Sequence, residues 1–278
     1  MIPKIIHHIA PKDKGKWHPL WKPCYDSWLD KFKGFEFKLW NDKEDIDDLV
    51  MSHYPEFWNL YKSFPYHIMR IDFARFCFLH LYGGIYADMD VYCYHNFHNY
   101  LNGGVYLLEA PWGDVPIENA LMVSDKGNEF FRLCMEKSQQ SYGKVKDKLG
   151  VNFIDPINRK VILNTAGPGI PHQVALEYKG KLGILSGELY NNHGMAYHPK
   201  LITRHVLTGM WGEEAFDNLK LEFKQMKRGK KHSFRDFMKE VYINEVKKYA
   251  YMDNVTFENF DFYKDYTNGE YLKKQFLT

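Results

Sequence analysis

The sequence predicts an α/β fold in which a mostly parallel sheet is flanked by helices, with a helical extension at the C-terminus. Residues 5–40 show an apolar strand, an amphipathic helix and an alternating strand in succession, the pattern of a βαβ unit and hence of parallel strands. Residues 66–82 predict a helix that is apolar on nearly all sides and leads through two glycines into another strand. With 278 residues, 45% of them hydrophobic, the chain can form one large domain or two small ones.

The first unit begins with a predicted strand at residues 5–9, where isoleucines flank two histidines. The following helix has its apolar positions at i, i+3, i+4 and i+7, which places them on one face. These positions are Tyr25, Trp28, Leu29 and Phe32. Residues 35–40 alternate with period two, as a strand does, and Asn41 or Asp42 can cap the next helix, which holds Ile46 and Val50.

The apolar helix at 66–82 is predicted to end at Gly83 and Gly84, because a left-handed helix cap favours glycine. The chain then re-enters the sheet at residues 85–87. Further strands are predicted at 105–108, 161–163 and 183–185, and a further helix at 128–142.

Composition excludes several classes of protein. The net charge of +2 does not indicate a nucleic-acid-binding protein. No apolar run approaches the roughly 18–20 residues of a membrane span, and the N-terminus does not have the pattern of a signal peptide. The four cysteines are far apart and form no CxxC pair, so we expect a reducing, cytoplasmic location and no structural zinc site.

We expect a catalytic domain at residues 1–215 and a basic helical extension at 216–278. Residues 220–248 contain ten Lys or Arg against four acidic residues. One interpretation is an amphipathic helix packed on the domain, and the other is peripheral binding to anionic lipid on the inner membrane face.

The triplet Asp88-Met89-Asp90 follows an apolar strand, at the edge where open α/β sheets bind ligands. Paired carboxylates there suit Mg²⁺ or Mn²⁺, which leaves coordination positions for substrate phosphates. The alternative is an acidic turn that caps the strand. A second triplet, Asp45-Ile46-Asp47, lies in an acidic helical stretch, and we interpret it as a solvated face.

Asp72 and Arg75 are one helical turn apart in the otherwise apolar helix. Buried charges are costly unless they are paired or face a polar cleft. The two residues therefore form a structural ion pair or project into the same cleft as Asp88 and Asp90.

Two blocks of sequence carry a family resemblance: Arg70 to Arg75 (RIDFAR) and Leu81 to Val91 (LYGGIYADMDV). Together they resemble the Asp-x-Asp sugar-binding region of glycosyltransferase family 32. That family includes fungal initiating α-mannosyltransferases and bacterial capsule or lipooligosaccharide enzymes, and is related to the glucosylating domains of large clostridial toxins. Shorter matching segments occur at 2–9, 38–42, 118–120, 165–168 and 205–211, so the resemblance covers roughly residues 2–211.

The resemblance implies a GT-A fold and a retaining transfer from a nucleotide sugar that depends on Mn²⁺ or Mg²⁺. It implies that Asp90 and His205 bind the metal, and that Asp88 contacts ribose and sugar hydroxyls. The residues it implies in catalysis are Asp88, Asp90, Arg75 and Asn119. The residues it implies in donor binding are Ile6, His7, His8, Ile9, Asp72, Arg75, Gly84, Asp88 and Trp211. From the sequence itself, His7 and His8 are more simply strand residues, and Glu118 is either a surface charge or an acceptor contact.

The resemblance thus implies a hexosyltransferase of polysaccharide or glycan synthesis. UDP-galactose, UDP-glucose, UDP-N-acetylglucosamine and GDP-mannose are the candidate donors, with the uridine donors favoured, and a saccharide or lipid-linked oligosaccharide is the acceptor. Two alternatives remain: a Mg²⁺-dependent phosphohydrolase that uses the Asp-x-Asp pair, and a carbohydrate-binding protein without catalytic activity, which the 17% of aromatic residues would allow.

Overall fold

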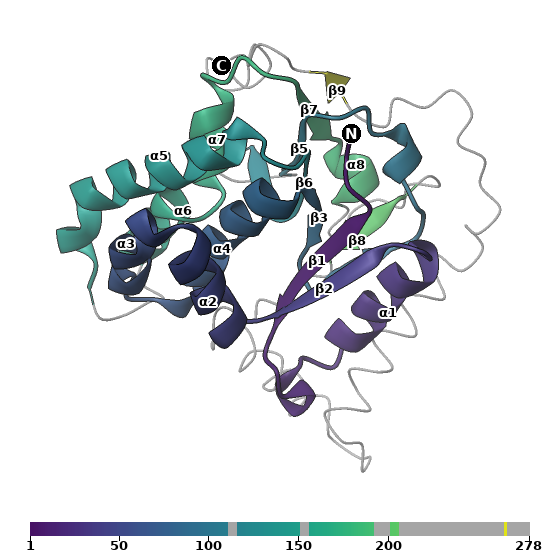
Figure 1. Ribbon diagram of the computed structural model, residues 1–278, viewed down its shortest axis with the longest axis horizontal. Helices are drawn as coiled ribbons and strands as arrows, with labels where there is room; N and C mark the ends of the chain where they lie inside the picture. Colours follow the sequence, from purple (N-terminus) through teal and green to yellow (C-terminus); the bar gives the residue numbers. More distant parts are fainter. Residues whose placement is uncertain (111–115, 151–155, 192–200, 206–263, 266–278) are drawn as a thin grey trace, which may run out of the picture.

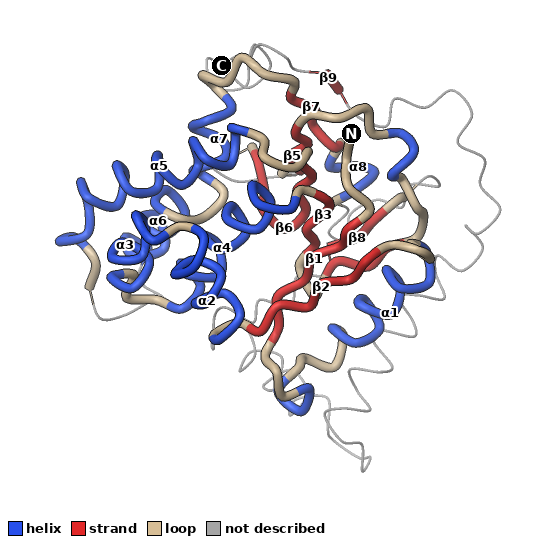
Figure 2. Tube along the Cα trace, viewed as in Figure 1, coloured by secondary structure: helices blue, strands red, loops and turns tan. Residues whose placement is uncertain are grey.

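The computed structural model describes residues 1–110, 116–150, 156–191, 201–205 and 264–265 (Figure 1). The predicted domain boundary at 215–216, the basic segment 220–248 and Trp211 lie outside the described residues and stay predictions. Figure 2 shows the strands as a central band, with helices on either side of it.

The main sheet has the strand order β2-β1-β3-β6-β5-β7-β9. Its strands are β1 (Ile5–Ala10), β2 (Glu36–Asn41), β3 (Gly84–Ala87), β5 (Val105–Glu109), β6 (Ile117–Ser124), β7 (Leu182–Leu185) and β9 (Lys264–Asp265). Strands β2, β1, β3, β5 and β7 run in one direction, whereas β6 and β9 run in the other. The described part of the chain therefore confirms a mostly parallel sheet in an α/β fold. A second, two-stranded sheet pairs β4 (Val91–Cys93) with β8 (Thr203–His205).

The predicted βαβ unit is confirmed. Strand β1 pairs in parallel with β2 from Ile5↔Glu36 to Ala10↔Asn41, and α1 (Trp21–Lys31) connects them. Trp28 anchors α1, since its side chain is fully buried and its Nε1 donates a hydrogen bond to the Val91 carbonyl over 2.8 Å. The prediction that Leu29 shares this buried face is wrong, because Leu29 is 39% exposed. The indole of Trp28, one position earlier, fixes which side of the helix is covered.

Helices cover both faces of the main sheet (Figure 1). One face carries α2 (Glu44–His53), α3 (Trp58–Ser63), α4 (His67–Tyr82), α5 (Glu129–Val145), α6 (Pro156–Thr165) and α7 (Gly169–Ala175), and the other carries α1 and α8 (Gly187–Tyr190). Short 3-10 helices occur at Lys14–Lys16, Pro55–Phe57, His98–Tyr100 and Lys146–Lys148. Each face of the sheet has its own hydrophobic core, and successive residues of β6 contribute to them in turn, because side chains alternate along a strand. Met122 packs on the α4 side, and Leu121 and Val123 pack on the α1 side.

Helix α4 is buried as predicted and ends at the glycine pair. Gly83 and Gly84 have φ angles of +65° and +97°, which favour glycine. A Cβ on Gly84 would stand 2.5 Å from the Ile5 carbonyl oxygen, so glycine also permits the close approach of β3 to β1. These two residues therefore set how the chain passes from α4 to the strand that carries the acidic triplet.

Two further sequence predictions are wrong. The N-cap of α2 is Lys43, and not Asn41 or Asp42 as predicted, although Oδ1 of Asn41 accepts hydrogen bonds from the backbone amides of Lys43 and Glu44. The predicted strand at 161–163 is wrong, because these residues lie in α6. A short β-branched apolar run does not distinguish a strand from a buried helical turn, and Pro156, at the first position of α6, was the signal for a helix start.

All four cysteines are buried free thiols. Among the described residues, we find no helix that combines the length and the apolar character needed to cross a membrane.

Candidate functional site

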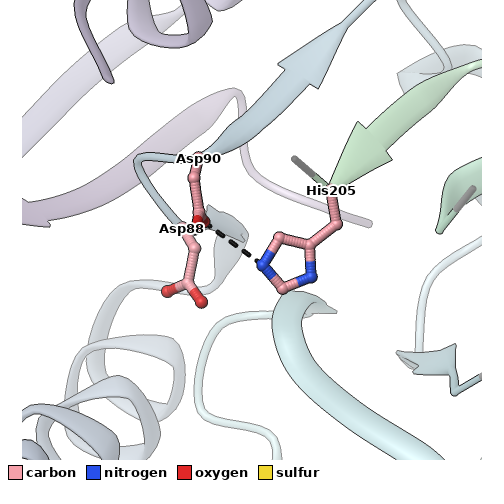
Figure 3. A group of neighbouring side chains, drawn as sticks. All are labelled: Asp88, Asp90 and His205. Atoms are coloured by element: carbon pink, nitrogen blue, oxygen red, sulfur yellow. Dashed lines mark ion pairs between the residues drawn. The ribbon is translucent and has the colours of Figure 1, made fainter. Parts of the chain in front are cut away.

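The candidate site lies where β3 ends at Ala87 and the chain continues through Asp88-Met89-Asp90 into β4. The pairing of Val91 with His205 in the second sheet sets the histidine beside Asp90, 115 positions earlier in the sequence. Figure 3 shows the side chains of Asp88, Asp90 and His205 converging. The structure thus brings together the two residues that the resemblance implies as metal ligands.

The donor atoms of this group suit a divalent cation. One ligand atom from each of Asp88, Asp90 and His205 lies within 4.8 Å of the other two. Nε2 of His205 is 3.3 Å from Oδ1 of Asp90, and Nδ1 is 3.2 Å from Oε2 of Glu118. Burial acts to lower the pKa of His205, but Asp90 and Glu118 raise it to about 10. The site therefore attracts positive charge strongly, and a metal ion would compete with the imidazole proton for Nε2.

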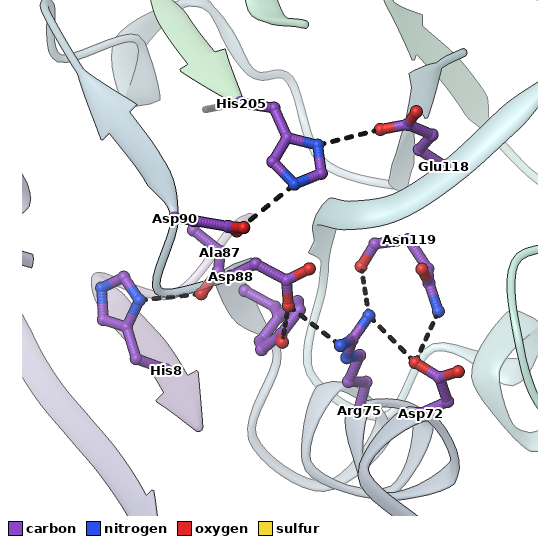
Figure 4. A network of polar contacts seen from close by, with 10 residues as sticks. His8, Asp72, Arg75, Ala87, Asp88, Asp90, Glu118, Asn119 and His205 are labelled. Atoms are coloured by element: carbon purple, nitrogen blue, oxygen red, sulfur yellow. Dashed lines mark hydrogen bonds and ion pairs between the residues drawn. The ribbon is translucent and has the colours of Figure 1, made fainter. Parts of the chain in front are cut away.

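Arg75 connects α4 to this group (Figure 4). Its Nη2 is 2.9 Å from Oδ1 of Asp88 and its Nη1 is 3.1 Å from Oδ1 of Asp72. The guanidinium also lies 4.8 Å from the ring centroid of Tyr86. The ion pair between Asp72 and Arg75 is therefore confirmed, and Arg75 also pairs with Asp88, whereas the projection of both residues into a cleft stays a prediction.

Asn119 joins this network from β6. Its Nδ2 donates to Oδ1 of Asp72 over 2.9 Å, and its backbone carbonyl accepts from Nη1 of Arg75 over 3.1 Å. Burial raises the pKa of Asp72 to about 6, although Arg75 opposes this shift, and burial also raises the pKa of Asp88. The carboxylates of Asp72 and Asp88 are thus destabilised by burial and depend on these polar partners.

Residues 19–107 match the family model described as a glycosyltransferase sugar-binding region containing a DXD motif. This region of the chain is therefore similar to the sugar-binding region of DXD glycosyltransferases. Asp88-Met89-Asp90 is its DXD motif, and the match includes Asp72 and Arg75.

Curated relatives are also glycosyltransferases, a class of transferases. The chain is 40% identical over 94 residues to inositol phosphoceramide mannosyltransferase 3 of Schizosaccharomyces pombe. This alignment covers 33% of this chain and 25% of that protein. It is 30% identical over 205 residues to the mannosyl phosphorylinositol ceramide synthase SUR1 of Saccharomyces cerevisiae. This second alignment covers 71% of this chain and 50% of the relative. The matches thus span from a quarter to half the length of these two relatives. Among solved structures, the PaToxG glycosyltransferase aligns with a TM-score of 0.43 at 16% identity, covering 63% of this chain and 69% of that one.

The segment Ile6 to Ile9, implied in donor binding, is buried in β1. Nε2 of His7 donates to the Gly83 carbonyl over 2.8 Å, and Nδ1 accepts from Nε1 of Trp40 over 3.1 Å. Nδ1 of His8 donates to the Ala87 carbonyl over 2.7 Å. Both histidines thus act as strand residues that hold the backbone before the DXD motif. Contact of Ile6, His7, His8, Ile9 or Gly84 with a donor stays a prediction.

We predict that His7 makes stability depend on acidic pH. Burial lowers its pKa from 6.5 to about 3, so between these pH values the unfolded chain binds a proton that the folded chain does not. The free energy of unfolding therefore decreases as the pH falls through this window. The glutamine of His7→Gln does not titrate. We therefore expect the slope of the free energy of unfolding against pH, between pH 6 and pH 4, to be shallower in this variant by about 1.4 kcal/mol per pH unit.

Urea denaturation at several pH values measures this slope. His53→Gln, at an exposed position of α2, is the matched control and should leave the curve unchanged. Parallel curves for the unmodified chain and His7→Gln would contradict the prediction.

Sequence reasoning missed Tyr86, and it named Glu118 only as a surface charge or an acceptor contact. Tyr86 donates its hydroxyl proton to Oδ1 of Asp88, and the i, i+2 spacing at the end of β3 was the available signal, because it places both residues on one side. Glu118 binds the ring of His205, and no local pattern pointed to that contact.

Proposed function

We propose that the chain is a metal-dependent GT-A glycosyltransferase that moves a hexose from a nucleotide sugar to a saccharide or lipid-linked acceptor, with retention of the anomeric configuration. One observation carries this proposal: the convergence of Asp88, Asp90 and His205 beside the buried Arg75 network. The similarity to the DXD family supports the reaction class. The mixed sheet flanked by helices supports the fold type.

Asp90, His205 and Asp88 would hold the metal ion. Two carboxylates suit Mg²⁺ or Mn²⁺, and the imidazole nitrogen favours a transition metal, so Mn²⁺ fits this donor set better than Mg²⁺. When bound, the ion would act as a Lewis acid that stabilises the negative charge of the departing diphosphate.

Arg75 and Tyr86 orient Asp88. Nη2 of Arg75 and the hydroxyl of Tyr86 both contact Oδ1 of Asp88, so Oδ2 is the oxygen that can receive a ligand. Arg75 is in turn fixed by Asp72 and by the Asn119 carbonyl. This network would therefore hold the first carboxylate of the DXD motif in one orientation before the donor binds, which reduces the ordering that binding requires.

The donor and acceptor are proposed from two sources. The relatives named mannosyltransferases favour a mannosyl donor, and the names of several refer to inositol phosphoceramide, a lipid acceptor. The sequence interpretation favours uridine donors. We therefore propose that the donor is one of four nucleotide sugars: GDP-mannose, UDP-galactose, UDP-glucose or UDP-N-acetylglucosamine.

The test incubates the full chain and Mn²⁺ with each of these nucleotide sugars and measures the nucleoside diphosphate that is released. When no acceptor is present, water takes its place and free hexose is the second product. Release from one donor that stops on addition of EDTA supports the proposal. Release of orthophosphate from phosphate esters, without cleavage of any nucleotide sugar, would favour the phosphohydrolase. Binding of sugars without any release would favour the carbohydrate-binding alternative.

A further inference from the structure

His205 is held between two carboxylates that contact opposite nitrogens of its ring. Asp90, from the DXD motif, faces Nε2 at 3.3 Å, and Glu118, from β6, faces Nδ1 at 3.2 Å (Figure 4). The side chain of His205 is 12% exposed and that of Glu118 is 21% exposed, so the contact with Glu118 is largely shielded from water. Within the described residues, the group that could hold a metal contains Asp88, Asp90 and His205 but not Glu118.

We propose that Glu118 is the positioning residue of the metal site: it accepts the Nδ1 proton of His205 and so directs Nε2 to the ion. This inference rests on the proposed metal-dependent function. A histidine that ligates a metal through one nitrogen commonly donates its other N–H to a carboxylate, which fixes the tautomer and the ring orientation. Glu118 lies on the side of the ring opposite the metal ligands, where such a carboxylate is needed.

The backbone around Glu118 is built to hold this position. The pairing of β5 with β6 shifts from Leu107↔Met122 to Leu108↔Glu118, so β6 bulges between these two pairs. Bulges next to active sites redirect side chains. The bulged segment is fixed on both sides, since the Asn119 carbonyl accepts from Arg75 over 3.1 Å and the Ala120 carbonyl accepts from the Asp88 amide over 2.8 Å.

The backbone of His205 is fixed separately, by pairing with Val91, the residue after Asp90. The position of the ring then depends on its own side-chain torsions, and the contact with Glu118 restrains them. Without that carboxylate, the ring can rotate and take Nε2 away from Asp90 and Asp88.

The test is Mn²⁺ affinity of the full chain without donor, measured as free Mn²⁺ by electron paramagnetic resonance. We expect Glu118→Ala to weaken binding by about 10- to 100-fold, the usual cost of losing a residue that orients a ligand. Glu118→Gln keeps an acceptor for Nδ1–H and should weaken binding less. Glu177→Gln, which removes a surface carboxylate from the chain, is the matched control and should bind as the unmodified chain does.

A double variant separates positioning from a general effect of charge. If Glu118 acts through His205, then Glu118→Ala adds no further loss of Mn²⁺ affinity in a His205→Ala background. The nitrogen coupling of a histidine ligand, seen by electron spin echo spectroscopy, should disappear in His205→Ala and weaken in Glu118→Ala.

Two failures can be told apart. Normal Mn²⁺ affinity in both Glu118 variants, or additive losses in the double variant, would overturn the role of Glu118 while leaving the metal site intact. Absence of Mn²⁺ binding by the unmodified chain would instead overturn the metal site, and this inference with it.

Discussion

Asp90→Asn is expected to reduce sugar transfer by about a thousandfold while the protein stays folded. An amide is a weaker ligand for a divalent ion and carries no charge. Two unit charges 4 Å apart interact by about 4 kcal/mol at an effective dielectric constant near 20, and each 1.4 kcal/mol corresponds to a factor of ten in rate. Asp90 is 8% exposed and also faces His205. The loss of its charge therefore weakens both the binding of the metal and the contact with the imidazole.

The chain contains a matched control for this variant. Asp47→Asn changes the same position in the second Asp-x-Asp triplet, where Asp47 pairs with Lys62 over 3.1 Å and accepts the hydroxyl of Tyr61. This triplet is on α2, and the predicted solvated face holds only for Asp45, because Ile46 is fully buried and Asp47 is half-buried. Asp47→Asn should keep its transfer rate and its Mn²⁺ requirement. Rates are compared by release of nucleoside diphosphate, with circular dichroism as the check on folding. Near-normal turnover of Asp90→Asn with an unchanged metal requirement would contradict the proposed role of Asp90.

The parts of the molecule that sequence predicted correctly are those with a local signal. The apolar helix α4 ends at two glycines whose positive φ angles favour this residue type, so both the helix and its end were readable. The position of the DXD motif after β3 followed from the same run of residues. The spacing of Asp72 and Arg75 on one helix allowed their ion pair to be predicted, because residues three positions apart lie on the same face of a helix.

The parts that sequence missed depend on contacts between distant segments. Glu118 and His205 are 87 positions apart, and only the bulge in β6 together with the β4–β8 pairing brings them together. Residues 161–163 were mistaken for a strand because a three-residue apolar run has no resolvable period. The charge of Glu118 alone gave no reason to prefer a buried contact over an exposed position.

Replacement of Arg75 is expected to cost more stability than any other single change at the site. Arg75 is 5% exposed and pairs with both Asp72 and Asp88. Arg75→Met fills a similar volume but leaves these two carboxylates facing each other without the guanidinium. Removing one partner of a buried ion pair typically costs about 3–5 kcal/mol. Arg75→Lys retains the charge but cannot make the two-pronged contact, so we expect an intermediate loss of stability and little transfer activity.

A second substitution tests whether uncompensated charge causes the loss. Asp72→Asn in the Arg75→Met background removes one of the two carboxyl charges and keeps an oxygen that can accept from Nδ2 of Asn119, the bond that Asp72 makes in the unmodified chain. The double variant should therefore be more stable to urea than Arg75→Met alone, although Asp72→Asn by itself destabilises the unmodified chain by leaving Arg75 with one partner fewer. Transfer activity should stay absent, because Arg75 no longer orients Asp88. A double variant that is less stable than Arg75→Met would show that lost packing, and not buried charge, dominates at this position.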